Sequence, residues 1–259
     1  MHIKYLVITV FLLGNCLVYS QSKKLIWADE FNYNGLPDST KWGYDHGGSG
    51  WGNKELQFYT ASRLENARVE KGHLIIEARK EDMQNMKYTS SRMVSKNKGD
   101  WKYGRIEVKA KLPKGKGVWP AIWMLPTKPV YGDWPKSGEI DIMEFVGYMP
   151  DSVFGSVHTG LYNHIIRTQK TKGVVLKDLA TSFHTYAIEW TKEKISFLID
   201  DKKYFEFVNE RSGPGAWPFD QHFHIILNIA VGGNWGGKYG VDDSIFPQMM
   251  EINYVRVYQ

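Results

Sequence analysis

The sequence predicts an all-β protein folded as a sandwich of sheets. Short segments rich in β-branched and aromatic residues follow one another along most of the chain, separated by Gly, Pro, Asp and Lys. No segment shows the 3.6-residue apolar period of a long helix. All-β sandwiches of this length often form one domain, and the 259 residues contain no repeats or Pro/Ser-rich linkers. We therefore expect a single domain over residues 21–259.

Residues 1–20 have the pattern of a signal peptide. Lys4 precedes an apolar run over residues 5–13, and Val18-Tyr19-Ser20 ends the segment. The apolar run is too short to cross a bilayer. We expect a secreted protein, extracellular or periplasmic, without a membrane span.

The only cysteine, Cys16, lies in this first segment. The mature chain would therefore form no internal disulfide. Lipid attachment to Cys16 is the less favoured alternative, because Asn15 stands where processing sites have a small residue. Removing residues 1–20 removes the single charge of Lys4 and lowers the formal net charge from +5 to +4. A charge this mild, without a clustered basic stripe, does not indicate a nucleic-acid partner.

Alternation and β-branched runs mark the strands along the chain. Residues 200–203, Asp-Asp-Lys-Lys, predict a hairpin turn between two of them. The polar and basic segment 163–177 predicts a mobile loop. The predicted strands include residues 74–78, 104–110, 185–190, 194–199 and 204–207.

Three carboxylates fall within six residues of another predicted strand. Glu139, Asp141 and Glu144 are separated by apolar residues, and charged side chains are rarely buried without a partner or a task. On a regular strand Glu139 and Asp141 share one face, whereas Glu144 points to the other. A β-bulge around Ile142 and Met143 would restore the parity and bring all three acids to one face.

If the acids converge, their chemistry would be glycoside hydrolysis with retention of configuration. Retaining glycosidases hold two carboxyl groups ~5–5.5 Å apart, one as nucleophile and one as acid/base. Glu139 and Glu144 would form this pair, and Asp141 would share a proton or hydrogen bond with the nucleophile. Like charges this close raise at least one pKa, as a general acid near neutral pH requires. The alternative is a polar strand face with solvated acids.

The stretch Glu-Ile-Asp-Ile-Met-Glu at 139–144 resembles the catalytic signature of glycoside hydrolase family 16, in the form that carries the extra bulge residue. Four other segments resemble the bacterial laminarinase branch of that family, and the resemblance covers about residues 25–259. They are Gly-Trp-Gly-Asn-Lys-Glu-Leu-Gln-Phe-Tyr-Thr at 50–60, Trp-Pro-Ala-Ile-Trp-Met-Leu-Pro at 119–126, Asn-Ile-Ala-Val-Gly-Gly-Asn-Trp-Gly-Gly at 228–237 and Tyr-Val-Arg-Val-Tyr at 254–258.

The resemblance sharpens the expected fold to a concanavalin-like β-jelly-roll sandwich of two curved antiparallel sheets with a concave substrate cleft. It makes Glu139 the nucleophile, Glu144 the acid/base and Asp141 the assisting carboxylate. It also matches His158 to a family histidine that hydrogen-bonds near the acid/base. The alternative for His158 is a half-buried strand histidine satisfied by backbone groups.

Tryptophans supply the expected substrate platforms, because indoles stack on the C–H faces of sugar rings. By resemblance Trp119, Trp123 and Trp235 flank the cleft. Core filling is the alternative for any single tryptophan.

Three polar residues complete the expected substrate-binding set. By resemblance Asn53 and Arg105 match positions that contact substrate, and Asn228 belongs to one of the matching segments. For Arg105, a strand-surface ion pair with Glu107 is the less favoured alternative, since the two side chains have a diagonal geometry and exposed pairs contribute little.

Carboxylate chemistry requires no cofactor, and no His/Cys cluster in the sequence suggests a catalytic transition metal. Members of the family often carry one structural calcium ion on the convex face, and Glu30, Gly72 and Asn253 stand at the matching places. Asn253 replaces the usual Asp, and its amide oxygen can bind a hard cation but brings no charge. The resemblance thus implies a structural Ca²⁺ of reduced affinity.

The resemblance implies an endo-β-glucanase that hydrolyses β-1,3 bonds in laminarin-type glucans, with mixed-linkage β-1,3/1,4-glucan as a further substrate. The N-terminal pattern adds secretion, and since the sequence shows no signal for association we expect a monomer. Met143 argues against the lichenase-type branch, which has the shorter motif. A galactan hydrolase acting on agar or carrageenan is one alternative, although the loops at 51–53 and 232–237 favour glucan. A non-catalytic β-glucan-binding protein is the other, although such proteins lose the glutamates that this chain keeps.

Overall fold

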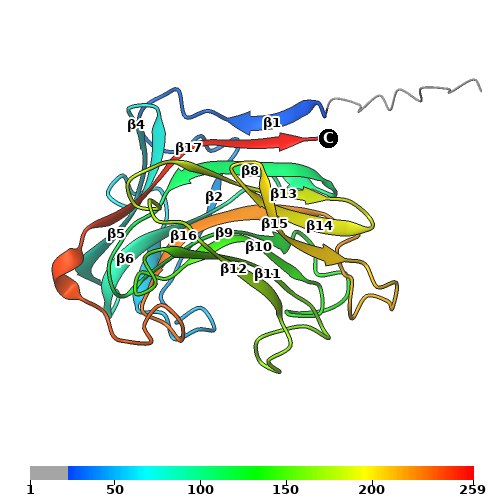
Figure 1. Cartoon of the computed structure of the whole chain (residues 1–259). Coiled ribbons are helices and arrows are strands. Elements are labelled where there is room, and N and C mark those ends of the chain that lie inside the picture. The colour runs from blue at the N-terminus through cyan, green and yellow to red at the C-terminus, as the bar shows by residue number, and fades with distance from the viewer. Residues whose placement is uncertain (1–22) are drawn as a thin grey trace, which may run out of the picture.

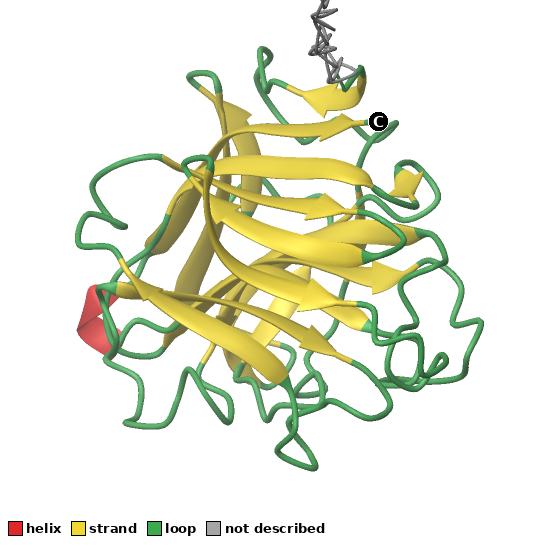
Figure 2. Ribbon diagram, turned by 45° about the vertical axis from the view of Figure 1, so that its right-hand side comes forward, coloured by secondary structure: helices red, strands yellow, loops and turns green. Residues whose placement is uncertain are grey.

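The structure, a computed structural model, describes residues 23–259. Almost all regular structure in this range is strand, arranged in two curved sheets that lie one over the other (Figure 1). One turn of 3-10 helix, η1 (Asp243–Ile245), is the single helical element of the described residues (Figure 2). Within them, no helix is long and apolar enough to cross a membrane. The predicted signal peptide and Cys16 lie outside the described residues.

The outer sheet is built around the C-terminal strand. Its order is β4 (Ala67–Glu70), β5 (His73–Met83), β17 (Gln248–Tyr258), β8 (Gly104–Lys111), β13 (His184–Trp190), β14 (Lys194–Ile199) and β15 (Lys202–Val208). The N-terminal strand β1 (Leu25–Asp29) pairs with the last residues of β17. The two ends of the described chain therefore lie side by side on this sheet.

The inner sheet is the second layer. Its order is β12 (Lys170–Val175), β11 (Ser152–His158), β10 (Glu139–Phe145), β9 (Val118–Pro126), β16 (Phe223–Val231), β6 (Met86–Val94) and β2 (Gly43–Asp45). The short strand β7 (Asp100–Trp101) pairs with the start of β16. The strand β3 (Gln57–Thr60) pairs with β6 and gives the one parallel pairing among the described strands. All other pairings are antiparallel, which confirms the predicted sandwich of curved antiparallel sheets.

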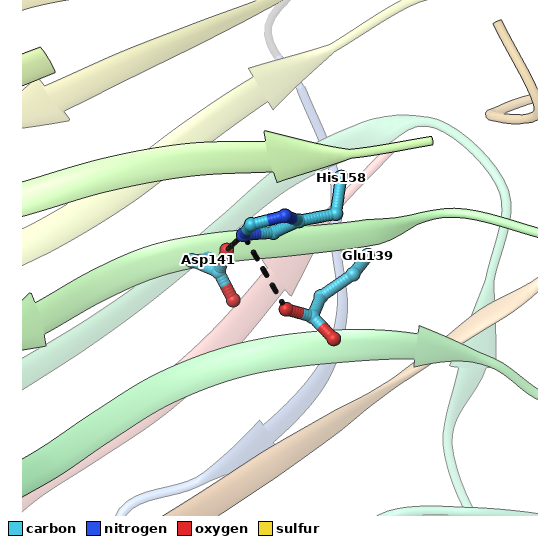
Figure 3. A group of neighbouring side chains, drawn as sticks. All are labelled: Glu139, Asp141 and His158. Carbon is cyan, nitrogen blue, oxygen red and sulfur yellow. Dashed lines mark ion pairs between the residues drawn. The ribbon is translucent and has the colours of Figure 1, made fainter. Parts of the chain in front are cut away.

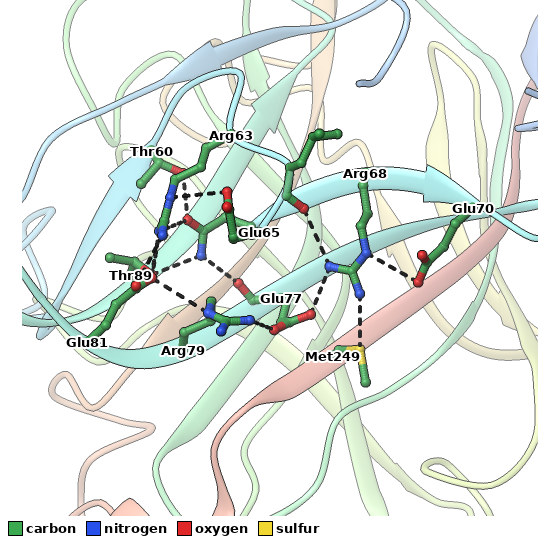
Figure 4. A network of polar contacts seen from close by, with 12 residues as sticks. Thr60, Arg63, Glu65, Arg68, Glu70, Glu77, Arg79, Glu81, Thr89 and Met249 are labelled. Atoms are coloured by element: carbon green, nitrogen blue, oxygen red, sulfur yellow. Dashed lines mark hydrogen bonds and ion pairs between the residues drawn. The ribbon is translucent and has the colours of Figure 1, made fainter. Parts of the chain in front are cut away.

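The hairpin of β5 and β6 carries the chain from one sheet to the other. The first half of β5 pairs with β17, and the second half pairs with β6. An ion-pair network with Arg63, Arg68 and Arg79 as its cations lies along β4 and β5 at this crossing (Figure 4). This hairpin joins the two layers.

Alternation along the strands separates the core from the exposed face of the inner sheet. In β16, Ile225, Leu227 and Ile229 have no exposed surface and pack in the core between the sheets. Each such side chain contributes ~1.5–3 kcal/mol by burial. The residues between them, such as Asn228, point to the opposite face of the sheet. The inner sheet thus has one apolar face and one face free to carry function.

The predicted strands and the predicted hairpin turn are confirmed, and the loop predicted over residues 163–177 is wrong in part, since residues 163–169 lie outside any strand but residues 170–175 do not. Asp200 and Asp201 have φ angles of 48° and 62°, as a two-residue type I′ hairpin requires, and β15 starts directly after them. The segment 163–177 contains β12, which pairs with β11. Most side chains of this edge strand are exposed, so its sequence lacks the apolar alternation by which strands are recognised.

Candidate active site

A bulge in β10 brings the three acids to one face. Across from β9, Asp141 pairs with Trp123 and Met143 with the adjacent Ile122, so two steps on β10 match one on its neighbour. The pairing with β11 shifts by one residue in the same place. Ile142 and Met143 are both buried in the core. The predicted bulge is therefore confirmed, and Glu144 returns to the face of Glu139 and Asp141.

The acids lie in an open cleft of about 620 Å³ on the exposed face of the inner sheet. Its floor comes from alternate residues of β9, β10, β16 and β6, and loops form its ends. The lining includes Trp51, Asn53, Glu55, Arg92, Trp119, Trp123, Trp134, Glu139, Asp141, Glu144, His164 and Asn228. The structure therefore brings together the three predicted acids and four of the six predicted substrate-binding residues.

His158 lies beside Glu139 and Asp141 (Figure 3). Its Nε2 atom is 3.4 Å from Oδ2 of Asp141 and 3.7 Å from Oε1 of Glu139. The resemblance implied a position near Glu144, but the strand register pairs His158 directly with Glu139. The structure thus places this imidazole at the expected nucleophile and the assisting carboxylate.

Each of the two glutamates accepts a hydrogen bond from an indole. Trp134 Nε1 donates to Oε2 of Glu139 at 2.9 Å, and Trp119 Nε1 donates to Oε1 of Glu144 at 3.2 Å. An N–H donor stabilises the ionised carboxylate. Both bonds also fix the orientation of the carboxyl groups.

Burial sets the protonation of the cluster. Desolvation raises the pKa of Glu139, and the charge of Asp141 raises it further, whereas His158 and the Trp134 N–H oppose the shift. Desolvation raises the pKa of Glu144 well above its usual range, again with Asp141 as the second cause. Both carboxyl groups therefore hold a proton to higher pH than a solvated glutamate. Glu139 differs in that the His158 imidazole lies 3.7 Å from its Oε1, where a positive charge would favour the carboxylate.

Arg92 of β6 is a cleft residue that the sequence reasoning missed. Its guanidinium carbon lies 4.7 Å from the ring centroids of both Trp51 and Trp123, and its Nε is 3.1 Å from Asp45. Cation–π contacts of this kind hold the loop bearing Trp51 against the sheet. The sequence alone carried no signal for it, because Arg92 is a single charge that reaches the cleft through the pairing of β6 with β16.

A hydrogen-bond relay supports the Trp123 platform from below. Trp123 Nε1 donates to Asn228 Oδ1 at 2.7 Å, and Asn228 Nδ2 donates to Tyr59 Oη at 2.9 Å. The Tyr59 hydroxyl donates to Glu55 at 3.2 Å, and Gln57 donates to the same oxygen at 2.7 Å. Asn228 is therefore engaged at both ends of its amide, and the buried Glu55 is the terminal acceptor of the relay.

Two residues of the predicted substrate-binding set are absent from the cleft lining. Arg105 lies on β8 of the outer sheet, where its Nε donates to Glu107 at 2.8 Å and its Nη2 to Asp201 at 2.6 Å. Its prediction as a substrate contact is wrong because β8 belongs to the other layer, and the ion pair with Glu107 that we favoured less is present. Trp235 packs edge-on against Trp119, with ring centroids 5.6 Å apart, and so supports that platform.

The residues expected to hold calcium do not fit a cation in this arrangement. Both carboxylate oxygens of Glu30 accept hydrogen bonds from Arg256, at 2.7 and 2.9 Å. The Arg256 guanidinium lowers the pKa of Glu30 and supplies the positive charge that this carboxylate needs. A dication at Glu30 would have to displace Arg256, and Asn253 would add no charge to favour that exchange.

Paired glutamates on one strand, set in an open cleft with exposed indoles, define a glycoside hydrolase of the polysaccharide-cleaving kind. Comparison with known proteins agrees. Residues 54–256 match the model of the glycosyl hydrolases family 16, and the chain belongs to that family. The predicted family is therefore confirmed, and with it an enzyme whose carboxylate chemistry needs no cofactor.

Individual relatives are similar over nearly the whole chain. The chain is 56% identical to a beta-glucanase of Rhodothermus marinus over 243 residues, which are 91% of this chain and 85% of the relative. The X-ray structure of the laminarinase from Rhodothermus marinus superposes with a TM-score of 0.91 at 55% identity, covering 92% of this chain and 97% of that one. The crystal structure of SCLam, a non-specific endo-β-1,3(4)-glucanase, gives a TM-score of 0.87 at 47% identity, covering 91% of each chain.

Proposed function

We propose that the protein is a secreted, retaining endo-β-glucanase that hydrolyses β-1,3-glucosidic bonds in laminarin-type glucans, with mixed-linkage β-1,3/1,4-glucan as a further substrate. The observation that carries the proposal is the placement of Glu139 and Glu144 on one face of a bulged strand, inside an indole-lined cleft. Relatives named laminarinase and non-specific endo-β-1,3(4)-glucanase support the substrate class.

In the first step of the proposed reaction, ionised Glu139 attacks the anomeric carbon while Glu144 protonates the departing glycosidic oxygen. This forms a covalent glycosyl-enzyme and releases the reducing-end fragment. In the second step Glu144 removes a proton from water, the water attacks the anomeric carbon, and Glu139 leaves. Two displacements at one carbon retain its configuration.

The surroundings of each acid support these assignments. The Trp134 N–H and His158 both favour the charged form of Glu139, as a nucleophile needs. Burial raises the pKa of Glu144 well above its usual range, which keeps a proton available for the leaving group. Asp141 lies between the two glutamates in the sequence and is almost completely buried. Its charge raises the pKa of both glutamates.

For substrate binding we propose that Trp119 and Trp123 stack on glucosyl rings and that Asn53 and Arg92 contact their hydroxyl groups. All four side chains line the cleft. Asn228 would act by holding Trp123, because both ends of its amide are engaged within the protein.

The test is reducing-end release on laminarin, mixed-linkage β-glucan and agarose, with Glu139→Ser as the control. We expect fast release from laminarin, slower release from mixed-linkage glucan, and no release by the variant. Nuclear magnetic resonance of the first product should show the β-anomer. Activity on agarose alone would move the protein to the galactanase alternative, and binding without release on all three would favour the glucan-binding alternative.

We also infer that residues 21–259 form one catalytic domain, that the protein is a monomer, and that residues 1–20 direct secretion and are removed. The apolar run that follows Lys4 supports the last inference. N-terminal sequencing of the exported protein tests it, since a chain that starts near Gln21 is expected. A lipid-modified N-terminus at Cys16 would instead support the anchored form.

A further inference from the structure

Three potential metal-ligand atoms converge in the cleft (Figure 3). They are Nε2 of His158, a carboxylate oxygen of Glu139 and a carboxylate oxygen of Asp141, and all lie within 4.8 Å of one another. One imidazole nitrogen and two carboxylate oxygens form a set that suits zinc and copper ions.

Within the described residues, the polar contacts of these ligand atoms are chiefly with one another, since His158 lies against both carboxylates and Glu139 hydrogen-bonds Asp141. Trp134 binds Oε2 of Glu139 and leaves Oε1, the oxygen that faces His158. Oδ2 of Asp141 is buried without a hydrogen-bond partner among the described residues, and the whole residue is only 2% exposed. A buried carboxylate oxygen without a partner is costly, and a cation placed between Asp141 and His158 would satisfy it.

The separations fit a metal at the centre. Zinc bonds of ~2.0–2.2 Å in tetrahedral geometry place neighbouring ligand atoms about 3.3–3.5 Å apart. The two distances from His158 Nε2 are 3.4 Å to Asp141 and 3.7 Å to Glu139. Both distances from the imidazole are thus within a few tenths of an ångström of those in a tetrahedral site, and the two carboxylate oxygens lie within 4.8 Å of each other, so a rotation of one carboxyl group would bring the three ligands around one ion. Glu139 and Asp141 line the cleft, so an ion held there would face it.

We propose that Glu139, Asp141 and His158 form a binding site for a transition-metal dication, Zn²⁺ or Cu²⁺, and that the bound ion inhibits the enzyme. Inhibition rests on the proposed function, since the ion would occupy the carboxylate assigned as nucleophile. Binding itself does not depend on that assignment. Ca²⁺ is disfavoured because it needs six to eight oxygen ligands.

The surroundings of His158 indicate an exchangeable ion. Its Nδ1 atom is buried with no hydrogen-bond partner in the described residues. Resident metal sites usually hold that second nitrogen with an acceptor, which fixes the ring and strengthens binding. A reversible, inhibitory site is therefore the form that this geometry supports.

The chain offers a matched control in a second histidine between two carboxylates. His184 uses Nδ1 for Asp200 at 2.7 Å and Nε2 for Asp178 at 3.1 Å. The two carboxylates lie at opposite nitrogens of the ring, so a single ion bound to one nitrogen could be reached by only one of them. His184→Gln should leave metal binding at the cleft unchanged.

The test is calorimetric titration of untagged protein with ZnCl₂ at neutral pH, without substrate. The parent protein should bind one ion in the cleft, His158→Gln and Asp141→Asn should each weaken binding at least about tenfold, and His184→Gln should not. Cu²⁺ electron paramagnetic resonance should show nitrogen coupling that His158→Gln removes. Circular dichroism and the Tm check that each variant is folded.

Inhibition is measured separately by reducing-end release with and without Zn²⁺, and chelation with EDTA should restore the rate. Unchanged Zn²⁺ affinity in folded His158→Gln and Asp141→Asn would overturn the proposed site. If titration shows binding at these residues but the protein cleaves no glucan, the metal site stands and the proposed function fails.

Discussion

At the scale of single residues, we expect the proton of Glu144 to set the alkaline limit of activity. The proposed acid must be protonated, so kcat falls as the pH rises through the pKa of Glu144, which burial holds well above its usual range. The Trp119 N–H favours the charged carboxylate and partly offsets that rise. Trp119→Phe should therefore move the alkaline limb of the kcat profile to higher pH.

The measurement is kcat at saturating laminarin from pH 5 to pH 10 for the parent protein and the variant. KM is expected to rise as well, because Trp119 lines the cleft, and saturation separates that effect from the titration. Trp101→Phe is the control, since this buried tryptophan belongs to the core on β7. An alkaline limb that stays in place or moves to lower pH would show that Trp119 does not tune the acid.

The sequence predicted the three acids but not Arg92 and Glu55, which also line the cleft. The spacing of Glu139, Asp141 and Glu144 carries its own signal, because three charges in an apolar strand need an explanation. Arg92 and Glu55 are single charges separated along the chain, and only the pairing of distant strands brings them to the cleft. Arg105 is the opposite case. It matches a substrate-contacting position by sequence, but its strand β8 belongs to the outer sheet and not to the sheet that forms the cleft.

At the scale of elements, the relay under β9 and β16 links the Trp123 platform to the loop that bears Glu55. Tyr59→Phe removes the hydroxyl that joins Asn228 to Glu55. The hydroxyl makes two hydrogen bonds, and the one from the Asn228 amide is the neutral bond that orients Trp123 through Asn228. The loss of that bond costs ~0.5–1.5 kcal/mol, so KM for laminarin oligosaccharides should rise about two- to tenfold. The effect on kcat should be smaller, because neither acid touches the relay.

Steady-state kinetics on oligosaccharides of defined length measure the effects on KM and on kcat separately. Tyr88→Phe is the matched control. Tyr88 lies on β6, the strand that pairs with the β3 strand of Tyr59, and its hydroxyl is also hydrogen-bonded, but the partner is Asp243, which does not line the cleft. If both variants lose stability alike and neither changes KM, the relay is structural only.

Elements were predicted where burial imposes a pattern. The strand 185–190 shows a partial alternation and the strand 194–199 a continuous apolar run, because the outer sheet packs against the core, and the structure has both strands within a residue of those limits. The bulge followed from parity alone. β12 was not predicted because an exposed edge strand is held by main-chain hydrogen bonds, which any side chain permits.

At the scale of the whole molecule, the crossing between the sheets depends on pH. Glu81 binds Arg63 through both oxygens, at 2.5 and 3.0 Å, and chiefly this contact lowers the pKa of Glu81 to about 2 (Figure 4). A carboxyl whose pKa is lower in the folded state stabilises above its unfolded pKa, ~4.3, and loses that contribution as the pH falls toward 2. Glu81→Gln should therefore lower stability by ~1 kcal/mol at pH 7, allowing for partial exposure.

Urea unfolding at pH 7 and at pH 3 checks this prediction. The difference between parent and variant should shrink at pH 3, where the parent has begun to lose the same interaction. Glu65→Gln is the control, since Glu65 is an exposed partner of the same arginine. A difference that stays constant between the two pH values would place the loss in packing and not in charge.

Calcium binding is also a property of the whole molecule, because its expected site lies where the two ends of the described chain meet. β1 pairs there with β17 on the outer sheet, and Glu30 forms an ion pair with Arg256. The guanidinium already neutralises the carboxylate through two hydrogen bonds, so calcium would have to break that pair to bind. We expect the same Tm, within about 1 °C, in 1 mM CaCl₂ and in 1 mM EDTA, because a ligand stabilises only when its concentration exceeds its Kd. Arg256→Gln frees Glu30 and should create a dependence of the Tm on calcium. A Tm of the parent protein that rises steadily with calcium concentration would show that Glu30 exchanges its arginine for the ion.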